Sequence, residues 1–289
     1  MTRTDQPLDP ARRHHSDGFF EVCKAHALYY QRWDACDGAP ILIVHGGGEH
    51  SGRYAQTIVR LVREGYTVHT FDLPGHGRSP GKRGHIPHFD QYVQSVQQFL
   101  VQVIERDHFQ KPILLGHSLG GLIATFFAIQ HPERIRCLVL SSPLWGLSVA
   151  VPWWKRLIAH LLSPIWPSLT MERPRLGKDA LSHDPQVGID YLADPWVHFR
   201  ASVRLYTELQ NRFRELPRVL LQLRVPLLVL QAGDDKIASA EAVKNLFPLV
   251  ASDSKRLIVY EGFYHEVLNE VEKERVFQDL ILWLRQKMG

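Results

Sequence analysis

The sequence contains little cysteine and no long hydrophobic run. Its 289 residues include three cysteines, Cys23, Cys36 and Cys137, an odd number without the spacing of a metal site. The longest apolar runs, such as residues 226–230, are far shorter than the roughly 20 residues of a membrane-spanning helix. We therefore expect neither a cysteine-ligated metal site nor a transmembrane segment.

The sequence also lacks a secretory signal and any dense run of charge. Residues 1–17 hold several basic side chains but no hydrophobic stretch, so we expect a flexible tail there and a cytoplasmic location. The net charge is only +4, and basic residues are scattered among acidic ones. This pattern argues against nucleic-acid binding, although a weak attraction to anionic membrane surfaces is compatible with it.

What the sequence does contain is a regular alternation of apolar, strand-like runs with amphipathic, helix-like stretches. The predicted strands cover residues 19–24, 28–33, 41–44, 67–71, 113–115, 135–140, 226–230 and 256–260, and the predicted helices cover 54–64, 89–106, 119–130, 240–249 and 271–287. The first two strands are expected to form an antiparallel pair at an edge. Strands that alternate with helices favour a mostly parallel sheet covered on both faces. We predict an α/β fold with a central sheet of about eight strands flanked by helices.

One long segment interrupts this alternation. Residues 144–217 are rich in tryptophan and proline and contain several helix-like stretches but no clear strand. They follow the sixth predicted strand, and the alternation resumes after them. We therefore predict a helical cap at residues 144–217, inserted into a core made of residues 18–143 and 218–289.

A glycine-rich pentapeptide contains the candidate nucleophile. Gly116-His-Ser-Leu-Gly120 matches the pattern G-x-S-x-G, follows a predicted strand and opens a predicted helix. Small flanking residues allow the strained turn that lifts such a serine hydroxyl above a sheet. The alternative is a turn that only connects the strand to the helix. The strand and helix on either side favour Ser118 as a nucleophile.

A serine hydroxyl needs a base to remove its proton, and that base is commonly a histidine oriented by a carboxylate. His265 is the candidate base, because it directly follows the last predicted strand and precedes the last predicted helix. Asp234 and Asp235 both follow the preceding strand, and we favour Asp235 as the orienting acid, with Asp234 as a turn residue. His183 and His198 lack this strand-end position, so we expect them to be structural or surface residues.

Acyl transfer by a serine passes through a negatively charged oxygen, which needs preorganised N–H donors. One expected donor is the backbone amide of Leu119, directly after the nucleophile. The second is expected from the glycine-rich loop that follows the third predicted strand. Gly47 is our choice for this donor, with Gly46 and Gly48 as alternatives.

The cap contains a helix-like stretch, residues 149–162, with a broad apolar face. Trp153, Trp154 and several leucines belong to this face, and Lys155 and Arg156 lie on a narrower side. One interpretation is a helix that lies in a membrane interface. The other is an apolar face that packs on the core over the active site. If the helix is a mobile lid, both interpretations hold.

Four segments resemble those of monoacylglycerol lipases and related lysophospholipases, a group within the α/β-hydrolase superfamily. They are His45–Tyr54, Gly75–Gly84, Gly116–Gly121 and Tyr264–Glu266. The first of them is the most specific, since G-x-S-x-G alone occurs throughout the superfamily. The similarity covers about residues 40–143 and 225–270.

The resemblance implies the α/β-hydrolase fold and a serine hydrolase, without metal or cofactor, that cleaves esters of single-chain acyl lipids. It also implies the triad Ser118, Asp235 and His265 and the oxyanion donors Gly47 and Leu119. One departure is Gly47, where some of these lipases have alanine; either residue supplies an N–H. The cap is matched far more weakly, and the cap determines which substrate fits.

Other functions are compatible with these motifs. A broad carboxylesterase or an acyltransferase would share the acyl-enzyme step, and a non-catalytic ligand-binding protein would share the fold. A metallohydrolase would need a ligand cluster such as H-E-x-x-H, which the sequence lacks. The motifs indicate neither the headgroup of the lipid nor the oligomeric state. Arg173, Arg175, Arg200 and Arg204 of the cap could bind a charged headgroup or only face solvent.

Overall fold

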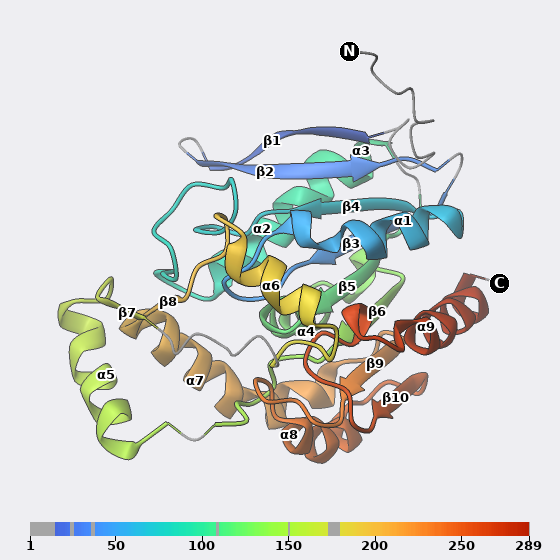
Figure 1. Cartoon of the computed structure of the whole chain (residues 1–289). Helices are drawn as coiled ribbons and strands as arrows, with labels where there is room; N and C mark the ends of the chain where they lie inside the picture. Colours follow the sequence, from blue (N-terminus) through green and yellow to red (C-terminus); the bar gives the residue numbers. More distant parts are fainter. Residues whose placement is uncertain are drawn as a thin grey trace, which may run out of the picture.

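An eight-stranded sheet runs through the centre of the molecule (Figure 1). The structure is a computed structural model that describes residues 15–23, 26–35, 38–107, 110–149, 151–172 and 180–288. In spatial order the strands are β1 (His15–Cys23), β2 (His26–Trp33), β4 (Thr67–Phe71), β3 (Pro40–Val44), β5 (Ile113–His117), β6 (Cys137–Ser141), β9 (Leu227–Ala232) and β10 (Lys255–Tyr260). The pairs β1–β2 and β2–β4 are antiparallel, and the other pairs are parallel. The predicted α/β fold with a mostly parallel sheet of eight strands is confirmed.

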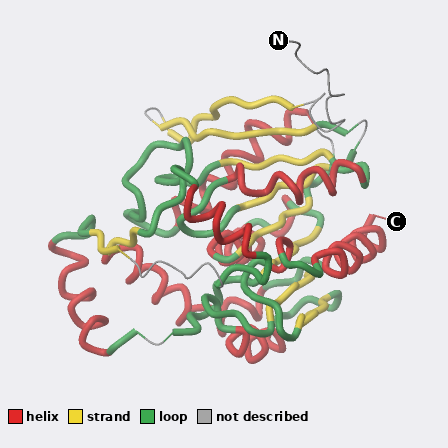
Figure 2. The backbone as a smooth tube through the Cα atoms, in the orientation of Figure 1, coloured by secondary structure: helices red, strands yellow, loops and turns green. Residues whose placement is uncertain are grey.

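Helices cover both faces of this sheet (Figure 2). One face is covered by α1 (Ala55–Arg63) and α9 (Lys273–Met288), and the other by α2 (Asp90–Phe99), α4 (Leu119–Gln130) and α8 (Ala240–Leu246). In β3, Leu42 and Val44 pack into one core, while Ile41 and Ile43 pack into the core on the opposite face. Because both faces are buried, such a strand is a continuous apolar run in the sequence. No helix in the described ranges is long and apolar enough to cross a membrane.

The helix predicted over residues 89–106 consists of three consecutive segments. After α2 the chain forms a π-helical turn, Leu100–Ile104, and then the short α3 (Glu105–Asp107). The wider π turn allows Leu100, Val103 and Ile104 all to be buried against the core.

The amino-terminal strand begins inside the segment that we predicted to be a tail. His15 pairs with Trp33 in the register of β1 and β2, and their rings lie 4.7 Å apart. Residues 15–17 therefore belong to the sheet, because they find hydrogen-bonding partners on β2. The rest of the predicted tail, residues 1–14, lies outside the described residues.

The chain between β6 and β9 forms a layer beyond the carboxyl ends of the parallel strands (Figure 1). We call residues 144–217 the insertion; its elements are α5 (Trp153–Ile165), β7 (Thr170–Glu172), α6 (Pro185–Ala193), β8 (Arg200–Ser202) and α7 (Val203–Val219), of which α7 ends two residues beyond it. The prediction that it contains no strand is wrong, because β7 and β8 pair antiparallel. With three residues each, they are too short to show an alternating pattern.

Two helices of the insertion differ in how they are attached. Glu208 on α7 accepts a hydrogen bond from the backbone amide of Phe89 in the core, at 2.8 Å. Helix α5 packs on α7, where the hydroxyls of Ser163 and Thr207 lie 2.9 Å apart. In Figure 1, α5 lies at the outer edge of the molecule. Helix α7 therefore ties the insertion to the core, and α5 is the outer layer.

Candidate active site

Ser118 lies at the sharp turn between β5 and α4. Its φ of 53° and ψ of −117° form a conformation that a residue with a side chain rarely adopts. The flanking glycines are required by close contacts: a Cβ at Gly116 would lie 2.4 Å from the carbonyl oxygen of Gly120, and one at Gly120 would lie 2.1 Å from that of Val44. Ser118 also precedes the amino end of α4, where the helix dipole favours negative charge. The turn has the geometry of a nucleophile elbow.

His265 and Asp235 meet on loops that follow the neighbouring strands β10 and β9. Oδ2 of Asp235 lies 2.7 Å from Nδ1 of His265, and both side chains are buried. Oδ1 of Asp235 accepts hydrogen bonds from the backbone amides of Ile237 and Ala238, at 2.8 and 2.9 Å. The carboxylate is therefore fixed at both oxygens. Asp234, the alternative acid, is exposed and does not share these contacts.

The charges around His265 determine its affinity for a proton. Burial lowers the pKa of His265, but the adjacent carboxylate of Asp235 outweighs burial, so the pKa is raised above the ordinary 6.5. Burial would raise the pKa of Asp235, and the histidine and the two amides hold it below its usual range. The ring of His117 lies 4.8 Å from that of His265, and burial, followed by the field of His265, lowers the pKa of His117 to about 4. The surroundings therefore raise the pKa of His265 and lower that of His117, so His265 is the more basic of the two.

The glycine loop after β3 borders Ser118. The backbone amide of Gly46 donates to Oε1 of Glu49 at 2.6 Å, so this N–H is engaged within the loop. A Cβ at Gly47 would lie 3.3 Å from Cδ2 of Leu119, which places Gly47 beside the residue that follows the nucleophile. All three glycines and Leu119 line one cavity. Because the N–H of Gly46 is already engaged, Gly47 or Gly48 is favoured over Gly46 as the second oxyanion donor.

A buried ion-pair network connects this loop to the histidine loop. Arg53 donates to Glu49 and also to Oε1 of Glu266, the latter at 2.7 Å. The hydroxyl of Tyr54 donates to Oε1 of Glu49 at 2.7 Å. Burial would raise the pKa of Glu49, but Arg53 outweighs burial and holds it well below its usual range. Because Glu266 follows His265 in the chain, the network links the position of the oxyanion loop to that of the base.

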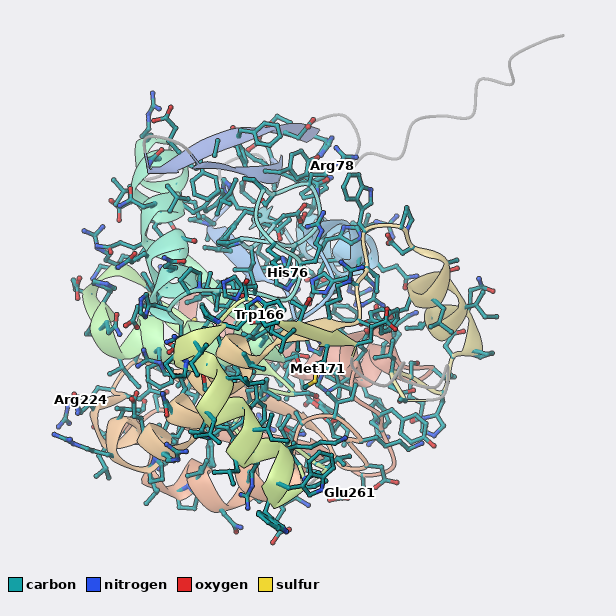
Figure 3. All side chains as sticks on the ribbon, turned by 90° about the vertical axis from the view of Figure 1, so that its left-hand side faces the viewer. His76, Arg78, Trp166, Met171, Arg224 and Glu261 are labelled. Carbon is teal, nitrogen blue, oxygen red and sulfur yellow. The ribbon has the colours of Figure 1, made fainter. Side chains whose placement is uncertain are left out.

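A cavity of about 340 Å³ extends from Ser118 into the insertion. Ser118 and His265 both line it. The insertion contributes apolar side chains to its wall, among them Leu147, Val151, Ala159, Met171, Leu205 and Leu209. Figure 3 looks onto this side of the molecule and labels Met171 close to α5. Ser118 and His265 thus face a space suited to a long apolar group.

Comparison with known proteins identifies the family. Residues 37–272 match the family model described as serine aminopeptidase, S33. The chain belongs to this family of serine hydrolases. The hydrolase is 33% identical over 261 residues to a monoacylglycerol lipase of Mycolicibacterium smegmatis, covering 89% of this chain and 92% of the relative. It is 37% identical over 244 residues to phospholipase YtpA of Bacillus subtilis, covering 83% of this chain and 92% of the relative.

A solved structure agrees with these relatives. The hydrolase superposes on the crystal structure of a monoacylglycerol lipase from Paleococcus ferrophilus with a TM-score of 0.83 and 31% identity, covering 90% of this chain and 99% of that one. The resemblance to the monoacylglycerol lipase group that we inferred from the sequence motifs is confirmed.

The two histidines that we expected to be structural or surface residues have different positions in the hydrolase. His183 lies 3.0 Å from Oε1 of Glu270 and stacks on the ring of Tyr264, which fits a structural role. His198 instead lines the cavity together with Ser118. Its position in the long, irregular insertion gave no indication of this.

The glycine loop allows a test of the second donor. In Gly47→Ala the new methyl group meets the Leu119 side chain, with Cδ2 at 3.3 Å, and the backbone N–H is kept, so we expect kcat/KM for an acyl ester to fall less than about threefold. In Gly46→Ala the methyl group would lie 2.8 Å from Oε1 of Glu49 and 3.2 Å from Cβ of Ser118, so the loop must move and the loss is expected to be about a hundredfold. Steady-state kinetics of the two variants measure the difference. Equal losses would contradict this assignment.

Proposed function

We propose that the hydrolase cleaves carboxylic esters of single-chain acyl lipids, monoacylglycerols or lysophospholipids, through an acyl-enzyme on Ser118. The observation that carries this proposal is the position of Ser118 and His265 on one cavity whose remaining wall is largely apolar. Burying an acyl chain in such a space contributes about 0.8 kcal/mol for each CH₂ group. The relatives from M. smegmatis, a monoacylglycerol lipase, and from B. subtilis, a phospholipase, support an ester hydrolase of acyl lipids.

In the proposed reaction, His265 removes the proton from Ser118 while its Oγ attacks the ester carbonyl. Nδ1 of His265 is held by Asp235, which leaves Nε2 for this proton. The tetrahedral oxyanion accepts hydrogen bonds from the amides of Leu119 and Gly47. The imidazolium then protonates the leaving alcohol, the acyl group stays on Ser118, and a water molecule activated by His265 releases the fatty acid.

Fatty-acid release from 1-oleoylglycerol and from oleoyl-lysophosphatidylcholine tests this function. We expect release from at least one of them at a kcat/KM well above that for a short-chain ester such as p-nitrophenyl acetate. A preference for the short ester would indicate a broad carboxylesterase. Transfer of the oleoyl group to added glycerol in place of water would indicate an acyltransferase.

We further propose that α5 contacts the surface of lipid aggregates. Its large apolar side chains point to solvent: Trp153 is 69% exposed, Leu161 60% and Ile165 80%. The interpretation that this face packs on the core therefore does not describe the arrangement seen here. Lys155 and Arg156 flank the tryptophans, as cations near lipid headgroups do in interfacial helices. Figure 3 shows α5 on the outside of the molecule, with Trp166 labelled beside it.

Removing both tryptophans tests this contact. The double variant Trp153→Ala with Trp154→Ala is expected to bind anionic liposomes at least about tenfold more weakly, because two aromatic anchors are lost. Co-sedimentation with liposomes gives the affinity. Phe19→Ala is a matched control, since Phe19 is 62% exposed but lies on β1, away from α5. Unchanged binding by the double variant, or an equal loss in the control, would refute the contact.

A further inference from the structure

A second cavity of about 240 Å³ adjoins the catalytic one. We call it the side pocket; it is lined by Arg83, Glu172, Pro195, Trp196, Val197, His198, Phe199 and Arg200. Three of these residues, Glu172, His198 and Arg200, also line the catalytic cavity. The two spaces therefore lie on either side of these three residues.

The side pocket begins close to the oxyanion loop. The backbone amide of His198 donates to the carbonyl oxygen of Gly48 at 2.9 Å, and Gly48 follows the proposed oxyanion donor Gly47. The ring of His198 lies 5.0 Å from that of His76, which lines the catalytic cavity. The side pocket therefore lies next to the loop that contains the proposed oxyanion donor.

An incompletely satisfied guanidinium group borders the side pocket. Nη2 of Arg83 donates to the carbonyl oxygen of Gly77, but its Nη1 is buried and has no hydrogen-bond partner among the described residues. Burial lowers the pKa of Arg83 from its ordinary value, although the group stays charged at neutral pH. A charged guanidinium group with one nitrogen unsatisfied by the protein favours an anion in the adjoining pocket.

The pocket also carries charge of the opposite sign. Glu172 on β7 is paired in register with Arg200 on β8, so a carboxylate and a second guanidinium group occur on the same short ribbon. Trp196, which is 41% exposed, adds an aromatic face. Guanidinium groups bind phosphate, whereas a carboxylate and an aromatic face bind an ammonium group. A free anion would use only the first of these features.

We propose that the side pocket binds the headgroup of a zwitterionic lysophospholipid, with Arg83 and Arg200 at the phosphate and Glu172 at the amine end. This inference rests on the proposed function, because the scissile ester of the same molecule would lie at Ser118. The aromatic face of Trp196 lies beside the ammonium group. The hydrolase then selects lysophospholipids by two charges of opposite sign and not by apolar surface alone.

The test compares three decanoyl lipids below their critical micelle concentrations, so that binding to aggregates does not contribute. They are decanoyl-lysophosphatidylcholine, decanoyl-lysophosphatidic acid and 1-decanoylglycerol. In Arg83→Gln and in Arg200→Gln, kcat/KM for lysophosphatidylcholine is expected to fall about tenfold more than kcat/KM for decanoylglycerol, since a charged hydrogen bond to phosphate is lost. In Glu172→Gln, kcat/KM for lysophosphatidylcholine is expected to fall about threefold relative to kcat/KM for lysophosphatidic acid, which has no ammonium group.

Controls separate a headgroup effect from a structural one. Arg275→Gln removes an exposed cation on α9. It is expected to leave the ratios between the kcat/KM values of the three lipids unchanged. Arg83 also supports the loop at Gly77, so its replacement could disturb the structure. The side chain of Arg200 is exposed, so Arg200→Gln provides an independent variant. Glycerophosphocholine is expected to compete with lysophosphatidylcholine in the wild type, and inorganic phosphate much less.

Several outcomes would overturn the assignment. They are equal losses for all three substrates, unchanged ratios, competition by inorganic phosphate alone, or a wild type that cleaves only decanoylglycerol. In each of these cases Ser118-dependent release from decanoylglycerol would leave the proposed function intact. If the wild type cleaves none of the three lipids, the proposed function fails, and the headgroup assignment fails with it.

Discussion

Replacing Ser118 with alanine is expected to lower kcat for 1-oleoylglycerol by about a millionfold, to the level left by binding and oxyanion contacts. The reason is that no other hydroxyl can take its position: the backbone at φ 53° on the turn between β5 and α4 holds one side chain over the cavity. A fluorophosphonate probe, which reacts with activated serines, should label the wild type and not Ser118→Ala. Fatty-acid release and labelling together measure the loss.

A second serine provides the control for folding and backbone strain. Ser142 also has a positive φ, 41°, and is buried at the end of β6. Its hydroxyl accepts a long hydrogen bond, 3.4 Å, from the amide of Ala232. Ser142→Ala is therefore expected to keep kcat within about tenfold of the wild type. Substantial labelling of Ser118→Ala, or activity close to the wild type, would show that a different residue is the nucleophile.

Replacing Asp235 with asparagine is expected to lower kcat about ten-thousandfold while leaving the fold intact. The amides of Ile237 and Ala238 can still donate to the side-chain oxygen of asparagine, so the side chain keeps its place. Its NH₂ group then donates to Nδ1 of His265, and the imidazole proton moves to Nε2. With Nε2 protonated, His265 cannot accept the proton of Ser118.

The pH dependence of kcat/KM provides a second readout of the Asp235→Asn substitution. In the wild type, protonation of His265 removes the base, so kcat/KM should fall as the pH drops through a pKa above 6.5. The adjacent carboxylate is what raises this pKa, so in Asp235→Asn the acid limb should move to lower pH. Asp234→Asn is the matched control, because Asp234 is exposed, and it should change neither kcat nor the acid limb by much. A large loss in Asp234→Asn with an unchanged Asp235→Asn would exchange the two assignments.

The sheet and its helices could be predicted because local patterns in the sequence encode them. Buried parallel strands are continuous apolar runs, and the turn at Ser118 is encoded by neighbouring glycines that meet backbone oxygens. The same local information placed Asp235 and His265 at the ends of adjacent strands, where the structure brings them within 2.7 Å. Spacing alone left Asp234 as an alternative, and only the three-dimensional contacts separate the two.

Features that depend on distant residues could not be predicted. Arg53 pairs with the nearby Glu49, but it also bonds Glu266, which lies more than two hundred residues further along the chain. Strands β7 and β8 are too short for any periodicity and exist because they pair with each other. The side pocket depends on Arg83 of the core meeting residues of the insertion, a contact that no sequence pattern indicates.

The insertion leaves and re-enters the sheet between two strands that hydrogen-bond to each other. The chain leaves the sheet after Ser141, which pairs with Leu230 of β9, and re-enters it at Leu227, which pairs with Leu138 of β6. Exchange of the whole block by recombination would therefore leave the register of every strand unchanged. A gene organised in this way can acquire a new substrate preference in one step while it inherits the same chemistry, and descendants of one ancestor can share a reaction but differ in the lipids they consume.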